Sequence, residues 1–240
     1  MHIPDGYLGP YTYIAMFLIM IPIWLYAGHK LNRELKSKQV PLLALSAAFS
    51  FVIMMFNVPV LGGSTGHAVG GAIVGIVLGP WAAVVSISVA LIIQALVFGD
   101  GGVTAIGANC FNMAFLMPFV AYYVYKFISM KSEVTSFRRI VAAALAGYIS
   151  LTVAAGATGL EFGLQPILHP AVDGMYMYMP YGLEVTLPAM LGEHMIFFSF
   201  LEALVTALVL AYLQKADPSM LEARKPKSKK AKGDMKPATA

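Results

Sequence analysis

The first two residues of the chain, Met1 and His2, carry three nitrogen atoms that can bind one metal ion. A free α-amine, the backbone amide of residue 2 and the His2 imidazole close two fused chelate rings, which hold the three nitrogens in a plane. A histidine at position 2 leaves the fourth planar position open. Planar nitrogen donors suit Ni(II) and Cu(II), and imidazole also accepts cobalt. The alternative is that His2 is an incidental exposed residue.

A second histidine, His67, follows the glycine-rich stretch Gly62-Gly63-Ser64-Thr65-Gly66. Glycines at this place allow backbones to approach closely. Beyond it, Gly71, Gly75 and Gly79 repeat at the four-residue spacing that is typical of tightly packed membrane helices. This setting can hold the His67 imidazole rigidly as the fourth nitrogen. The alternative is a histidine that caps a helix at the membrane surface.

The composition predicts that these histidines are positioned by a membrane protein. The 240 residues are 59% hydrophobic and 12% charged, whereas about a quarter of a soluble domain is charged. A spanning helix needs roughly 17–25 residues, and six of seven apolar stretches reach that length. The seven stretches are 8–28, 41–57, 67–79, 81–98, 105–125, 140–160 and 188–213. The short one, 67–79, fits a half-buried or re-entrant helix.

The positive charges predict the orientation of the chain. All 16 Lys and Arg residues lie within 30–38, 126–139 and 215–236. If all three segments are cytoplasmic, the fold is all-α with seven transmembrane helices, the N-terminus outside and the C-terminus inside. The outer face then collects carboxylates and imidazoles without Lys or Arg, so it should concentrate cations. The same distribution also follows by default from the positive-inside rule. It gives no indication of a nucleic-acid partner.

We therefore expect three regions: an N-terminal metal-capture segment (1–10), a helical membrane domain (11–213) and a basic cytoplasmic tail (214–240), disordered near anionic headgroups. The start of the chain has no basic segment or cleavage pattern typical of a signal peptide. We expect Met1 to be kept in the mature protein. Because the sequence has no P-loop motif, we expect no enzyme activity and no cofactor, and ATP hydrolysis by another chain.

The opening Met-His-Ile-Pro-Asp-Gly-Tyr-Leu (1–8) resembles the signature of the substrate-specific membrane subunit of nickel and cobalt energy-coupling factor importers, the CbiM/NikM family. Segments 62–72, 94–109 and 202–207 are similar to that family too. The resemblance implies planar coordination by the Met1 amine, the amide and imidazole of His2, and the His67 imidazole. It also implies a transmembrane coupling subunit, two ATPase subunits and usually a small accessory membrane subunit in the cell membrane.

The choice between the two metals rests on few residues. Pro4-Asp5 resembles the nickel-type opening of the family more than the cobalt-type opening. A cobalt importer subunit that serves cobalamin synthesis is the alternative. The first span has no Ala-x-x-x-Ala, a pattern with which some substrate subunits dock the coupling subunit, so the docking face is unassigned.

Four polar side chains are candidates to orient the ligands by hydrogen bonding: Asp5, Ser64, Asp100 and Asn109. For Asp100 and Asn109, helix capping is the alternative. Glu202 lies inside a predicted span, where an ionisable group is costly and usually functional. We interpret it as a buried structural partner or a proton-coupled group rather than a ligand. Glu193 and His194 form either a relay near the site or an interfacial anchor.

Two other functions are weighed against metal import. An intramembrane serine protease would use Ser64 as its nucleophile and His194 as its base. A Cu(I) transporter would use the alternating thioethers of Met175–Met179, although this tyrosine-rich segment also fits an interfacial belt. The single Cys110 excludes an internal disulfide and is predicted to be a small packed side chain.

Overall fold

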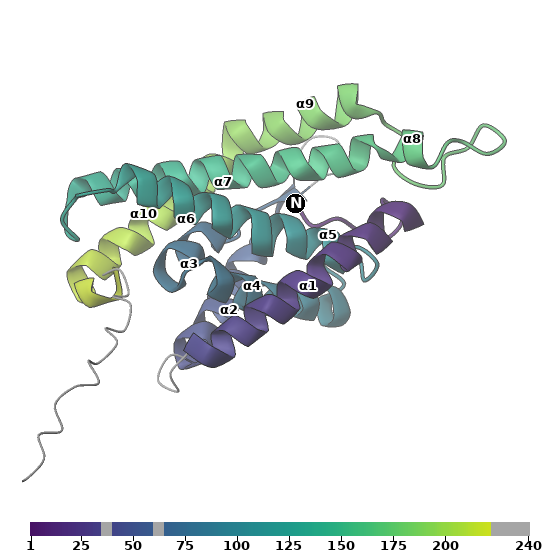
Figure 1. Cartoon of the computed structure of the whole chain (residues 1–240). Helices are drawn as coiled ribbons and strands as arrows, with labels where there is room; N and C mark the ends of the chain where they lie inside the picture. The colour runs from purple at the N-terminus through teal and green to yellow at the C-terminus, as the bar shows by residue number, and fades with distance from the viewer. Residues whose placement is uncertain (35–39, 60–64, 222–240) are drawn as a thin grey trace, which may run out of the picture.

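A computed structural model describes residues 1–34, 40–59 and 65–221, which form a bundle of α-helices (Figure 1). Five helical stretches are long and apolar enough to cross a membrane: Pro10–Arg33, Pro80–Phe98, Ile106–Ile128, Phe137–Leu168 and Leu183–Ala216. A shorter apolar helix covers Val40–Met54. These elements confirm the predicted helical membrane fold. The number of crossings and the sides on which the termini lie stay predictions.

Several of these long apolar stretches consist of more than one helical element. The helices are α1 (Pro10–Glu34), α2 (Val40–Met54), α3 (Gly71–Leu78), α4 (Pro80–Ile93), α5 (Ile106–Asn109), α6 (Met117–Ile128), α7 (Phe137–Gly163), α8 (Gln165–Leu168), α9 (Leu183–Glu193) and α10 (Ser199–Ala216), with a 3-10 turn η5 (Pro218–Leu221). Three π-helical turns join them: η2 (Gln94–Phe98) after α4, η3 (Cys110–Leu116) between α5 and α6, and η4 (His194–Phe198) between α9 and α10. Strands β1 (Val58–Pro59) and β2 (Thr65–Gly66) form a short antiparallel pair.

Helix α3 is the short element expected at 67–79. Its eight residues extend for about 12 Å at 1.5 Å per residue, too little to cross a hydrocarbon core of about 30 Å. The predicted glycines explain its burial. A Cβ at Gly75 would lie 2.8 Å from the carbonyl oxygen of Pro118, so only glycine allows α3 to pack this closely on α6. Gly79 has a different role. A Cβ there would meet no neighbour, but its φ of +86° lies outside the helical region and α3 ends at this residue.

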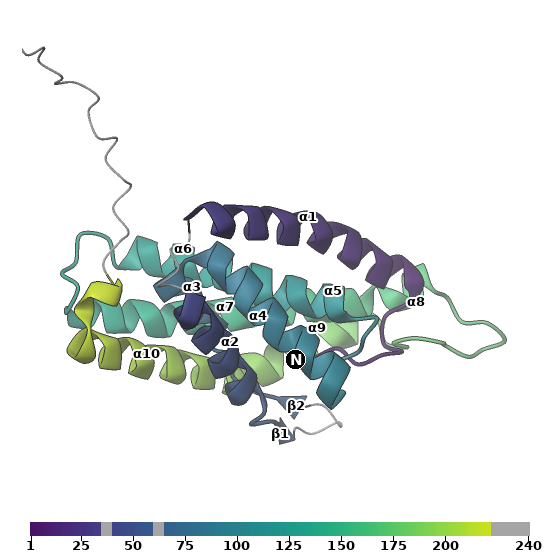
Figure 2. The same cartoon turned by 90° about the horizontal axis from the view of Figure 1, so that it is seen from below.

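The described basic residues gather at one end of the bundle. Figure 1 and Figure 2 both show the end of α1, the α6–α7 connection and the end of α10 at that end, with the connection from α8 to α9 at the opposite end. These elements carry Lys30 and Arg33, the basic residues of 126–139, and Lys215. This clustering fits the charge pattern of the sequence. The predicted tail beyond residue 221 lies outside the described residues.

The first nine residues are not helical, yet they do not extend into solvent. Met1, Ile3 and Leu8 are buried, and both views place the N-terminus within the bundle (Figure 1, Figure 2). Ile3 and Leu8 pack with Ala105 and Ala108 of the α5 region. Burying one such aliphatic side chain stabilises the fold by about 1.5–3 kcal/mol. The N-terminal segment is thus part of the folded core.

Candidate metal centre

Hydrogen bonds fix the N-terminal segment to α5 and to the turn before it. The Asn109 side chain pairs with the backbone of Ile3, accepting from its N–H (2.8 Å) and donating to its carbonyl (3.2 Å). The N–H of Gly102 donates to the same carbonyl at 2.8 Å. Asn109 was a candidate to orient an imidazole. The structure instead places it on the backbone, where it sets the position of the residue that follows His2.

Asp5 makes the second attachment. Its carboxylate accepts hydrogen bonds from the backbone N–H groups of Val103 (3.0 Å) and Thr104 (2.8 Å) and from the Thr104 hydroxyl. The Thr104 hydroxyl and these amides hold the pKa of Asp5 below its ordinary value. A Cβ at Gly102 would lie 2.4 Å from the backbone nitrogen of Asp5, so this close approach requires glycine. Asp5 therefore anchors the segment and does not face the ligands.

The Met1 amine is the first of the candidate ligands. Met1 is 5% exposed, and burial lowers the pKa of its amine from 8.0 to about 6, against the opposing effect of the Glu193 and Asp100 carboxylates. At neutral pH the amine is therefore mainly unprotonated. Its lone pair is available to a metal ion without loss of a proton.

His2 lies next to it, with a side chain that is 6% exposed. Its Nδ1 is 3.0 Å from a carboxylate oxygen of Asp100. Burial lowers the pKa of His2, although the hydrogen bond that its Nδ1 donates to Asp100 opposes this effect. Burial alone would raise the pKa of Asp100, but the hydrogen bond and charge of His2 hold it below its usual range. A chelate that includes the His2 amide closes through Nδ1, so metal binding requires the imidazole to turn or this contact to open.

His67 faces His2. The two ring centres are 4.7 Å apart and the ring planes are inclined by 30°. Nδ1 of His67 donates to the carbonyl of Ala68 at 3.0 Å, which leaves the lone pair on Nε2, an atom with no hydrogen-bond partner among the described residues. Two imidazoles in neighbouring positions on one metal, each about 2.0 Å from it, would have centres roughly 4.5 Å apart. The observed spacing matches that arrangement.

Glu202 of α10 holds the backbone that follows His67. Its buried carboxylate accepts hydrogen bonds from the N–H groups of Val69 (2.8 Å), Gly70 (3.0 Å) and Ala72 (3.3 Å). The Ala72 amide lies in the first turn of α3, where N–H groups have no partner within the helix, and the helix dipole favours a negative charge at that end. Glu202 is therefore a positioning residue for His67.

Replacing Glu202 should weaken metal binding through the position of His67. Glu202→Leu leaves three buried N–H groups without an acceptor, at a cost of about 1–3 kcal/mol each, and should lower the thermal midpoint in detergent sharply. Glu202→Gln replaces one carboxylate oxygen with a donor, and we expect about a tenfold weaker nickel Kd, equivalent to about 1.4 kcal/mol. Leu204→Ala, at an exposed position of the same helix, is the control. A Glu202→Gln variant with unchanged Kd would show that the carboxylate does not position His67.

His194 lies behind this site and is fully buried. Its Nδ1 donates to the carbonyl of Met190 (2.8 Å) and lies 3.5 Å from Glu193, and its Nε2 has no described partner. Phe198, one turn further, lies where a Cβ of Gly66 would be, only 2.0 Å from it. The turn η4 thus packs directly against the residue before His67.

The three π-helical turns begin at or next to residues of the candidate site. They start at Gln94, whose side chain acts to raise the pKa of His2, at Cys110, which follows Asn109, and at His194. Single π-helical turns often occur at functional sites. We did not identify Gln94 as a site residue from the sequence. The available signal was an amide within an otherwise apolar span.

The remaining candidates lie elsewhere. Ser64, the proposed protease nucleophile, is outside the described residues. Met175 and Met177 are 70% and 74% exposed, whereas Met179 lines a cavity near the N-terminus. Cys110 is fully buried, as predicted.

A family model described as the cobalt uptake substrate-specific transmembrane region matches residues 2–220. The chain belongs to this family. Relatives and solved structures agree with that assignment. The chain is 48% identical over 225 residues to the fused nickel transport protein NikMN of Rhodobacter capsulatus, a match that covers 94% of this chain and 65% of that protein.

Other members are similar over their whole length. The chain is 46% identical to a putative metal transport protein of Methanocaldococcus jannaschii, over 93% of this chain and 96% of that protein. A crystal structure of a truncated transition metal transporter superposes with a TM-score of 0.83 at 47% identity, covering 89% of this chain and 98% of that one. This member of the cobalt-uptake family is thus a multi-pass membrane protein of metal transport.

Proposed function

We propose that this chain is the substrate-capture membrane subunit of an ATP-driven importer of the energy-coupling factor type, with Ni(II) as its cargo. The observation that carries the proposal is the burial of the Met1 amine beside the His2 and His67 imidazoles, with Asp100 and Glu193 near them. Three nitrogen-bearing groups from two distant segments meet here, although burying so many polar groups is costly unless they bind something.

The donor set suits a planar four-nitrogen complex. The amine, the His2 amide and Nδ1 of His2 would occupy three positions, and Nε2 of His67 would occupy the fourth. Two negative charges, on the ionised amide and on Asp100, would balance the charge of a divalent ion. Planar nitrogen coordination favours Ni(II) or Cu(II), and Co(II) shares the imidazole preference. Nickel is preferred here because the fused relatives from Rhodobacter capsulatus and Lactiplantibacillus plantarum are named nickel transport proteins.

The partner subunits are proposed from the same fused relatives. The chain spans 65% and 66% of the length of these two fused relatives. We propose that a small accessory membrane subunit supplies the function of the additional part. A transmembrane coupling subunit and two ATPase subunits would complete the importer, and the docking face for them stays unassigned.

Metal analysis of the purified protein tests the proposal. After exposure to equal Ni(II), Co(II), Cu(II) and Zn(II) and removal of free ions, we expect about one nickel per chain and the yellow absorption band of planar nickel. Cobalt in its place would support the cobalt alternative, which related proteins named as cobalt transport proteins also favour. Cu(I) retained only under reducing conditions would favour the thioether hypothesis. A protein that retains none of these ions would refute metal capture.

A further inference from the structure

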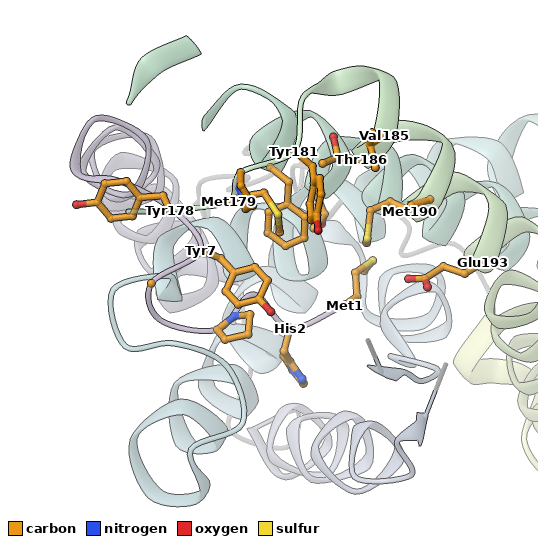
Figure 3. Close-up of a pocket in the computed structure, with 16 residues that line it drawn as sticks. Met1, His2, Tyr7, Tyr178, Met179, Tyr181, Val185, Thr186, Met190 and Glu193 are labelled. Atoms are coloured by element: carbon orange, nitrogen blue, oxygen red, sulfur yellow. The ribbon is translucent and has the colours of Figure 1, made fainter. Parts of the chain in front are cut away.

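A cavity of about 500 Å³ lies beside the candidate metal centre, between the N-terminal segment and the helices α7 and α9. Met1 and His2 form part of its wall (Figure 3). Tyr7, Met179 and Tyr181 line its other side, and Ala189 and Glu193 of α9 line it too. The cavity therefore reaches two of the candidate ligand residues directly.

The candidate ligands themselves are enclosed. Met1 is 5% exposed, the His2 side chain 6% and His67 0%. An ion held by these groups would be out of contact with bulk solvent. It must reach them through a space that touches them, and this cavity touches Met1 and His2.

The carboxylate of Glu193 makes this cavity attractive to cations. Of the described residues that line it, Glu193 carries the only carboxylate. Figure 3 shows this carboxylate directed toward Met1, and its charge acts on the Met1 amine. A carboxylate in a confined, partly apolar space attracts cations more strongly than one in open water.

The size of the cavity suits an ion that still holds its water. Six waters at about 30 Å³ each occupy roughly 180 Å³, which fits within the cavity and leaves room for passage. A bare ion would need far less space. The hydroxyl groups of Tyr7 and Tyr181 lie on the wall and can contact the water shell.

We propose that this cavity is the entry chamber for a hydrated divalent cation, and that Glu193 holds the ion before the nitrogen ligands displace its water. The proposal rests on the proposed function, because it requires the nitrogens of Met1, His2 and His67 to be the destination. It assigns to Glu193 a role in the rate of loading rather than in final coordination.

A reversible block of the cavity tests the path. In Ala189→Cys, the new thiol can be modified with an aromatic methanethiosulfonate, whereas the native Cys110 is fully buried. Stopped-flow absorbance with Ni(II) should show loading and release both slowed by about tenfold or more, with unchanged Kd, because an obstruction in a path raises one barrier for both directions. Reductant should restore both rates. Ile196→Cys, 78% exposed and outside the cavity lining, is the control.

The charge of Glu193 is tested separately. Glu193→Gln should lower the loading rate by about tenfold at low ionic strength, and the difference should shrink as salt screens the carboxylate. Glu184→Gln, on the same helix α9 but outside the cavity lining, should load like the parent chain.

The outcomes separate the two proposals. If the parent chain fails to bind nickel or cobalt tightly, the proposed function is wrong. If the parent binds and the modified Ala189→Cys chain loads at the parent rate, the entry path is wrong and the proposed function stands. A modification that weakens Kd at unchanged loading rate also overturns the path, since it would reflect distortion of the site.

Discussion

Adding one alanine before Met1 is expected to abolish tight nickel binding. The extension converts the Met1 amine into an amide and moves the new amine one residue further from His2, so the two-ring chelate that leaves the fourth planar position to His67 can no longer form. The segment cannot shift by one residue to bring the new amine to the place of the old one, because Ile3 is fixed by Asn109 on its other side. We expect a loss of about 4 kcal/mol or more, roughly a thousandfold in Kd.

Calorimetric titration of purified protein with Ni(II) measures this effect. One alanine added after Ala240 is the matched control, since it adds the same mass at the other terminus. The thermal midpoint without metal should stay close to that of the parent chain if the extended amine remains in the neighbouring cavity. An extended chain that binds nickel as tightly as the parent, and that still loses this affinity on His67→Gly, would exclude the amine as a ligand.

Replacing His67 with glycine should cause the second largest loss. The imidazole supplies the fourth nitrogen, and its removal leaves that position to water or to no ligand at all. We expect about a hundredfold weaker nickel binding, equivalent to about 2.7 kcal/mol, and loss of the planar-nickel absorption band. His29→Gly, in the part of α1 remote from the site, controls for the loss of a histidine.

Free imidazole offers a sharper test of the same residue. His67 is completely buried, so His67→Gly creates an enclosed space of the shape of an imidazole. Millimolar imidazole should enter this space and restore both the absorption band and much of the affinity. The His29→Gly control should keep its nickel affinity, so imidazole should change neither its absorption band nor its Kd. If imidazole restores stability but not nickel binding in His67→Gly, the residue has a packing role only.

Hydropathy and charge predicted the membrane fold because each span carries its own signal. The length of 67–79 indicated an unusual element, and α3 is indeed too short to cross. The π-helical turns η2, η3 and η4 could not be predicted, since a single inserted residue leaves the apolar pattern unchanged.

In the candidate site, too, local features could be predicted from the sequence and contacts between distant residues could not. Met1 and His2 were recognisable because their chelate is local chemistry, which requires only adjacent residues. Glu202 was recognisable as costly within a span, but its partners are amides 130 to 133 positions earlier in the chain. For Asn109 the sequence offered hydrogen bonding to an imidazole or helix capping, whereas its amide pairs with the backbone of Ile3. Hydrogen bonds between backbone and distant side chains leave no periodic trace in a sequence.

The hydrogen bonds of the N-terminal segment also set an order for biogenesis. Residues that leave the ribosome first are held by residues made much later: Ile3 by Asn109, Gly9 by Gln165, and the turn after His67 by Glu202. Contacts so distant along the chain form late in folding. A chain interrupted before α10 therefore contains both histidines but no assembled centre. Under the proposed function, ion capture would therefore await the completed protein, and unfinished chains in the membrane would not sequester a scarce metal.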